Sequence, residues 1–126
     1  MSEQQVHVVF GAGQVGRELS VRYQCLNAPY TDWPRRFPPL QRGVLAAAER
    51  TDALLVSLEN LYGYGPIGKV PMTEDLPLAA TTVKGRTRAA ITRELLAAAE
   101  AGRVRTAIGR ASDFFGAGIT TGTTLG

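Results

Sequence analysis

A chain of 126 residues with 44% hydrophobic residues has the size of one domain and enough apolar side chains for a buried core. Its formal net charge is +3, no stretch approaches the roughly 18 apolar residues of a membrane span, and no basic segment leads into an apolar run at the start. These features predict a soluble, cytoplasmic protein without membrane partners, and the lone cysteine, Cys25, is expected to be a small buried hydrophobe with no disulfide or metal role.

The first predicted elements are an apolar strand and a glycine-rich loop. Residues 6–10, Val-His-Val-Val-Phe, are typical of a strand buried on both faces, in which His7 is expected to be structural. The run Gly11-Ala12-Gly13-Gln14-Val15-Gly16 follows directly and has the GxGxxG form. Such glycines permit a tight turn and close approach of a pyrophosphate, which then rests against the amino terminus of the next helix. The run predicts NAD or NADP binding, with a plain strand-turn-helix as the alternative.

The acidic residue that accompanies this fingerprint is not found at a strand end. It is expected about 20 positions after the loop, where it binds the adenosine ribose. The nearest candidate, Asp32, lies between Pro29 and the pair Trp33-Pro34, which is typical of a turn or a helix entry. We therefore expect this chain to lack the ribose clamp.

The middle of the chain predicts strands and helices in alternation. A short helix from residue 14 to about 21 precedes a strand at residues 23–26, and residues 53–57 predict another buried strand. Helical character at residues 40–50 places Leu40, Val44 and Leu45 on one face. The segment between the first of these strands and this helix is predicted to be a loop, because it contains Pro29, Pro34, Pro38 and Pro39.

The second half predicts a long loop, a long helix and a last strand. Residues 62–77 form the loop, whose length makes it a candidate functional segment. The helix is expected at residues 83–101, weakened by Gly85 and stopped by Gly102, and the strand at residues 104–108. The arginines between positions 86 and 110 alternate with acidic and apolar residues, which indicates a solvated helix face rather than a nucleic-acid-binding surface. The alternation of strands and helices along the chain predicts an α/β domain with a parallel sheet.

Four blocks of residues resemble the NAD-dependent epimerase/dehydratase family of short-chain dehydrogenases/reductases. They are Tyr23-Gln24-Cys25-Leu26-Asn27, Asn60-Leu61-Tyr62-Gly63-Tyr64-Gly65-Pro66, Thr73-Glu74-Asp75-Leu76-Pro77-Leu78, and residues 110–116. The first block is similar to the family's fourth Rossmann strand, the second to the fifth strand and its loop, and the last to the substrate-side turn after the sixth strand. The resemblance implies that Leu26 and Asn27 lie beside the cofactor with the glycine loop. It also implies a set of substrate-side residues, Tyr62, Tyr64, Ser112 and Asp113.

Against that family, the chain resembles an internally deleted and C-terminally truncated member. It passes from the first strand directly to the fourth, so residues 1–116 are expected to form one incomplete NAD(P)-binding Rossmann-like domain, and residues 117–126 a flexible tail. The strands of a complete Rossmann sheet lie in the order 3-2-1-4-5-6. The retained strands 1, 4, 5 and 6 are neighbours in that order, which predicts a parallel sheet of about four strands flanked by helices. The opened edge beside the first strand predicts self-association into a homo-oligomer.

The catalytic pair of the superfamily, a tyrosine followed four positions later by a lysine, is absent. None of the four tyrosines has lysine at that spacing. The corresponding positions hold Lys84 and Arg88, which share a helix face, while Ser57 and Asn60 lie near the family's serine or threonine position. A lysine whose pKa is lowered by a neighbouring cation can act as a base, but two cations do not reproduce a phenol-ammonium pair, and a binding or solvated role is favoured.

Two functional hypotheses follow from these residues. The first is an oxidoreductase or epimerase-type domain that binds NAD(H) or NADP(H) and acts on a small sugar-like or sugar-nucleotide-like substrate. The second is a catalytically inactive remnant or interaction module that oligomerises through its exposed sheet edge.

Overall fold

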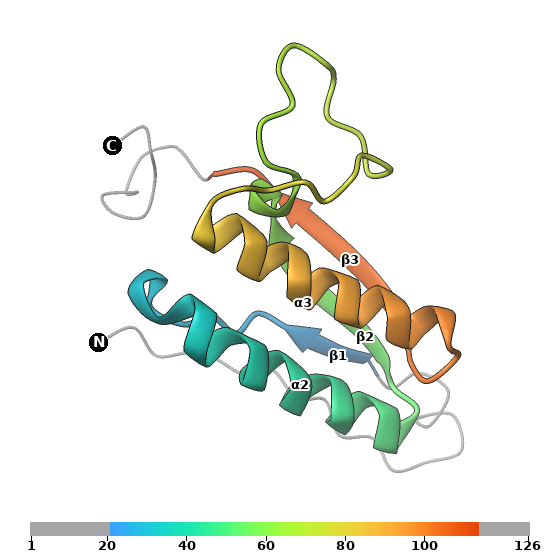
Figure 1. The fold of residues 1–126 in the computed structure, drawn as a ribbon. Coiled ribbons are helices and arrows are strands. Elements are labelled where there is room, and N and C mark those ends of the chain that lie inside the picture. The colour runs from blue at the N-terminus through green and yellow to red at the C-terminus, as the bar shows by residue number, and fades with distance from the viewer. Residues whose placement is uncertain (1–20, 114–126) are drawn as a thin grey trace, which may run out of the picture.

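A computed structural model of the chain describes residues 21–113, and over this range strands and helices alternate (Figure 1). The elements in chain order are β1 (Val21–Gln24), the 3-10 turn η1 (Tyr30–Asp32), α2 (Trp33–Thr51), β2 (Leu54–Asn60), the 3-10 turn η2 (Leu61–Tyr64), α3 (Val83–Glu100) and β3 (Arg105–Ala111). The three strands are parallel and lie in the order β1-β2-β3. The predicted α/β class with a parallel sheet is thus confirmed. The strand at residues 6–10, the glycine loop, the first helix and the tail lie outside the described residues.

Both helices lie on the same face of the sheet (Figure 1). Helix α2 connects β1 to β2, and α3 connects β2 to β3. Crossovers between parallel strands are almost always right-handed, and two consecutive crossovers in one direction therefore bring their helices to one side. The order β1-β2-β3 agrees with the order expected for the last three of the four predicted strands. The first predicted strand, at residues 6–10, lies outside the described residues.

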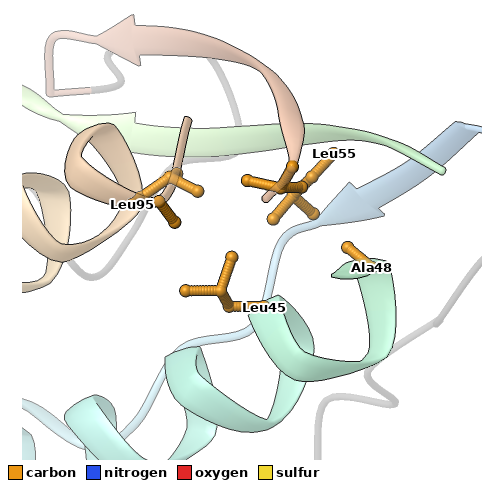
Figure 2. Close-up of a cluster of buried hydrophobic side chains, with 6 residues drawn as sticks. Leu45, Ala48, Leu55 and Leu95 are labelled. Carbon is orange, nitrogen blue, oxygen red and sulfur yellow. The ribbon is translucent and has the colours of Figure 1, made fainter. Parts of the chain in front are cut away.

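The core fills the space between this sheet face and the two helices. Leu55 of β2 is fully buried and packs in one cluster with Leu45 of α2 and Leu95 of α3 (Figure 2). Along β2, Leu55, Ser57 and Glu59 are buried, whereas Leu58 on the opposite face is 47% exposed. The strand is therefore buried on its helix side and only partly covered on the other, which differs from the prediction of a fully buried strand.

The predicted loop at residues 27–39 is wrong in its second half, because α2 begins at Trp33 and contains the last three of its prolines. Pro34 is the second residue of the helix, where a backbone N–H would have no acceptor within the helix. Pro38 and Pro39 lie deeper and each removes one helical hydrogen bond, at a cost of about 3 kcal/mol per residue. Helix formation here must be stabilised by tertiary packing.

Aromatic burial supplies that packing. The side chains of Trp33 and Phe37, one turn apart, are fully buried, and the Trp33 indole N–H donates to the carbonyl oxygen of Ala28 at 2.8 Å. Each such side chain contributes about 1.5–3 kcal/mol on burial. The same face continues through Gln41, whereas Leu40, predicted to face the core, is 37% exposed. Leu45 is buried and Val44 packs against the core as predicted, so only Leu40 departs from the predicted face.

Helix α3 agrees with the prediction at both ends. It runs from Val83 to Glu100, the Thr82 hydroxyl accepts a hydrogen bond from the Gly85 N–H at 3.1 Å, and Gly102 adopts a φ of 69° past the end. Gly85 has a packing role that the sequence did not reveal. A Cβ at this position would lie 2.6 Å from the Ala80 Cβ and 2.7 Å from the Tyr62 carbonyl oxygen. The missing side chain lets α3 approach η2 closely.

The remaining predictions differ in boundaries and exposure. The strand predicted at residues 23–26 lies two residues earlier, and those at 53–57 and 104–108 extend three residues further. Asp32 lies at the entry of α2, as expected, while Cys25 is exposed and not a buried hydrophobe. None of the helices within residues 21–113 is long and apolar enough to cross a membrane.

Candidate functional site

A cleft of about 160 Å³ lies where the three parallel strands end. It is lined by the segment after β1, by the end of β2 with η2, by the segment after β3, and by the first half of α3. Open α/β sheets bind their ligands outside the carboxyl ends of the strands. The cleft gathers most of the described site residues predicted from the sequence: Leu26, Asn27, Asn60, Tyr62, Arg88, Ser112 and Asp113.

The segment after β1 is fixed by a buried amide pair. The Gln24 side chain donates to Oε1 of Gln41 on α2 at 2.8 Å, and its own Oε1 accepts the Leu26 N–H at 2.5 Å. The Asn27 side chain in turn accepts the N–H of Ala28 at 3.0 Å. Since Gln24 is 1% exposed, its bond to Gln41 is shielded from water, and the three bonds together hold the backbone that forms one wall of the cleft.

Tyr62 crosses the cleft from η2 to the segment after β3. Its hydroxyl donates to Oδ1 of Asp113 at 3.1 Å, and its backbone N–H donates to Oδ1 of Asn60 at 3.2 Å. Burial raises the pKa of the Tyr62 phenol, and hydrogen bonds with Tyr30 and Asp113 raise it further. The phenol is therefore protonated at neutral pH and acts as a hydrogen-bond donor.

Lys84 and Arg88 share a face of α3, as predicted, but each is engaged with aromatic rings. The Lys84 ammonium lies 4.3 Å from the centroid of the Tyr30 ring. The Arg88 guanidinium carbon lies 4.5 Å from the Phe37 ring centroid and 5.0 Å from that of Trp33. These are cation–π contacts, which favour binding and positioning roles for both cations.

Arg88 is buried, which corrects the prediction that the arginines of this helix form a solvated face. Only 5% of the residue is exposed, whereas Arg86 and Arg93 are exposed as predicted. Burial lowers the pKa of the Arg88 guanidinium, and the nearby charge of Glu59 opposes that shift. A buried arginine that lines a cleft is a strong candidate for ligand recognition.

Glu59 is the carboxylate beside it. Its Oε2 accepts a hydrogen bond from the Thr92 hydroxyl at 2.7 Å and lies 3.8 Å from Nε of Arg110. Burial raises the pKa of Glu59, while the Thr92 hydrogen bond and the charges of Arg88 and Arg110 lower it. Glu59 and Arg88, which line the cleft, thus form one cluster with Arg110, which lines the neighbouring hollow.

The other predicted residues lie elsewhere. Ser57 is fully buried in the face of β2 that the helices cover and does not line the cleft, so the structure does not bring it to the other candidate catalytic residues. Tyr64 lines a separate hollow, where its hydroxyl contacts Arg110 and donates to the Glu74 carbonyl oxygen at 3.3 Å. The predicted cofactor-binding residues Gly11, Gly13, Gln14, Val15 and Gly16 lie outside the described part of the chain.

Sequence reasoning missed the roles of Tyr30 and Glu59, and it misjudged Arg88. A signal existed for two of them. Arg88 lies three residues before Ile91 and seven before Leu95, on the apolar stripe of α3. Glu59 occupies the same face of β2 as Leu55, because strand side chains alternate with a period of two. Charged residues at core positions of two facing elements indicate a buried ion cluster.

Between residues 21 and 113, no group of three or more histidine, cysteine or acidic side chains could hold a metal ion. No protein-family model, curated protein or solved structure matches the chain.

Proposed function

We propose that this chain is a nicotinamide-dinucleotide-binding domain of the NAD-dependent epimerase/dehydratase type, whose reaction partner is a sugar-like or sugar-nucleotide-like molecule. The main support is the cleft at the carboxyl ends of the strands. Asn27, Tyr62 and Asp113 come to it from three separate blocks that resemble the family. This edge of an open α/β sheet is where ligands bind.

The described residues fit one end of such a cofactor. Small-molecule sites usually measure about 300–1,000 Å³, so a cleft of about 160 Å³ takes one ring rather than a whole dinucleotide. Leu26 offers an apolar wall, Tyr30 an aromatic one, and Asn60 an amide. We assign the nicotinamide end to this cleft and the pyrophosphate to the glycine loop at residues 11–16. When bound, the nicotinamide ring supplies hydride transfer.

The side chains of the cleft support orientation of a substrate more than proton transfer. The protonated Tyr62 phenol, held by Asp113, can reorient toward a substrate oxygen as a donor. The tyrosine-lysine pair is absent from the sequence, and Lys84 contacts the face of the Tyr30 ring rather than its hydroxyl. The proposal is therefore cofactor binding, with no claim of turnover by the tyrosine-lysine route.

Isothermal titration of the folded chain with NADH and NADPH tests the proposal. We expect saturable binding with a micromolar to millimolar dissociation constant, and loss of binding in Gly13→Val, because a side chain there blocks the approach of the pyrophosphate. Gly43→Ala is the control, since nothing lies within 4 Å of the added Cβ on the exposed face of α2. Absence of saturable binding by a chain with native circular dichroism would overturn the proposal.

A second candidate is an interaction module that self-associates through the sheet. Within the described residues, β1 pairs only with β2, and its Tyr23 is 57% exposed. Exposed apolar side chains favour association, and so would the open edge that the sequence predicts beside residues 6–10. Light scattering distinguishes this candidate from a monomeric cofactor-binding domain.

A further inference from the structure

We propose that Arg88 forms a subsite for one anionic group of a ligand, a carboxylate or a phosphate, at the floor of the cleft. The inference goes beyond the proposed function, because a cleft that binds a small anion need not bind a dinucleotide.

The hydrogen-bonding state of Arg88 is the first observation. The side chain lines the cleft and is 5% exposed, yet its Nε and Nη1 atoms have no hydrogen-bond partner among the described residues. Buried polar groups in folded proteins are nearly always paired with protein or water. Two unsatisfied donors on one buried guanidinium therefore indicate a partner that residues 21–113 do not supply.

Preorganisation of the guanidinium is the second observation. Phe37 and Trp33 contact it at 4.5 Å and 5.0 Å, and both rings are fully buried. These rings restrict its rotation without using its N–H groups, since aromatic rings contact the cation through their faces. An arginine held in this way can bind a planar carboxylate or a phosphate with little loss of side-chain entropy.

The charge balance is the third observation. Two guanidiniums, of Arg88 and Arg110, face the single carboxylate of Glu59, and Oε1 of that carboxylate has no hydrogen-bond partner in the described part of the chain. The cluster of these three side chains therefore carries one net positive charge. An anion would compensate this charge in a site with little access to water.

The size of the cleft limits what the anion can be attached to. A volume of about 160 Å³ admits a carboxylate or a phosphate with a small ring or a short chain. A long polyanion such as a nucleic-acid backbone does not fit. The expected ligand is therefore a small acid or a phosphorylated small molecule.

The direct test uses inorganic phosphate and acetate as probes, with chloride at matched ionic strength as the control. The full chain is titrated with each probe while the Arg88 Nε–H signal is followed by NMR, the signal being assigned by its loss in Arg88→Lys. We expect a saturable shift of this signal with phosphate, with acetate or with both, and none with chloride. A response to phosphate alone identifies a phosphorylated ligand, and a response to acetate alone identifies a carboxylic acid. A stationary Arg88 signal with both probes overturns the inference.

Variants test the same site by its affinity. Arg88→Gln is expected to weaken probe binding at least tenfold, and the control Arg50→Gln, exposed in the last turn of α2, to leave it unchanged. Glu59→Gln should tighten binding severalfold, because it removes the competing charge and keeps an oxygen that accepts from Thr92. If Arg88→Gln does not fold, the affinity of Glu59→Gln for the probes and the shift of the Arg88 signal in the wild-type chain still test the subsite. Unchanged affinity in both folded variants would contradict the assignment.

The glycine loop is the other place where a phosphate could bind, and Gly13→Val separates the two sites. This variant should lose dinucleotide binding and retain the shift of the Arg88 signal. If the wild-type chain binds NADH but neither phosphate nor acetate shifts the Arg88 signal, only the anion subsite is overturned. If phosphate or acetate shifts the signal but the chain does not bind NADH, only the proposed cofactor is overturned.

Discussion

Gly85 determines how closely α3 approaches the end of β2. Adding a Cβ would create contacts of 2.6 Å and 2.7 Å, the second with a backbone oxygen that cannot rotate away. We expect Gly85→Ala to lower the free energy of unfolding by about 1–3 kcal/mol, the usual range for overpacking, despite the better helix propensity of alanine. Urea unfolding measures the change. Gly43→Ala, with open space around its Cβ, should raise stability by about 0.5–1 kcal/mol, and equal effects of the two changes would contradict this interpretation.

Glu59 makes the stability of the chain depend on pH. Because burial raises its pKa above 4.5 in the folded state, the folded state binds this proton more tightly than the unfolded state does. The resulting stabilisation is fully present below pH 4.5 and is lost as the pH rises through the folded pKa. Glu59→Gln mimics the protonated side chain. Relative to this variant, the wild-type free energy of unfolding should therefore fall as the pH increases, which urea unfolding at a series of pH values will measure; a constant or rising difference would contradict the prediction.

At the level of single elements, the local sequence determined α3 well and the start of α2 poorly. The hydroxyl cap of Thr82, the apolar repeat through Ile91 and Leu95, and Gly102 act within one segment, so they can be recognised without the fold. The start of α2 depends instead on burial of Trp33 and Phe37 against α3 and the loop before η1, which prolines obscure in the sequence. Tertiary packing overrides local propensity there.

The proline positions in α2 allow this competition to be measured. Pro39 is exposed and lies inside the helix, so Pro39→Ala should restore one backbone hydrogen bond and stabilise the chain by about 2 kcal/mol, after allowance for the more flexible unfolded state. Pro34 is equally exposed but is the second residue of the helix, and Pro34→Ala should change stability by less than about 0.5 kcal/mol. Thermal unfolding compares the two variants. A larger gain from Pro34→Ala would mean that the helix begins earlier in solution and that Pro34 lies in its interior.

At the scale of the whole molecule, the sheet topology accounts for why part of the site was predictable. Leu26, Asn60 and Ser112 each follow or end a strand, and parallel strands bring such positions to one edge regardless of the details of packing. The burial of Arg88 could not be obtained in this way. It depends on how α2 and α3 pack, which places Phe37 of one helix against a cation of the other.

The same topology leaves one face of the sheet without a described helix (Figure 1). This face is the one through which we expect self-association if the chain is an interaction module. Tyr23 of β1 pairs with Val56, so its side chain points to the same face as Leu58 of β2, and the two residues are 57% and 47% exposed. If this face drives association, the mass from light scattering should rise with protein concentration. Tyr23→Lys should lower that mass, because a charged side chain on this face opposes its burial against a second copy.

Val83→Lys is the matched control for that experiment. Val83 is also 57% exposed but lies at the start of α3, so this change adds the same charge away from the sheet face and should leave the mass unchanged. A monomeric mass for the wild-type chain at every concentration would exclude the interaction module.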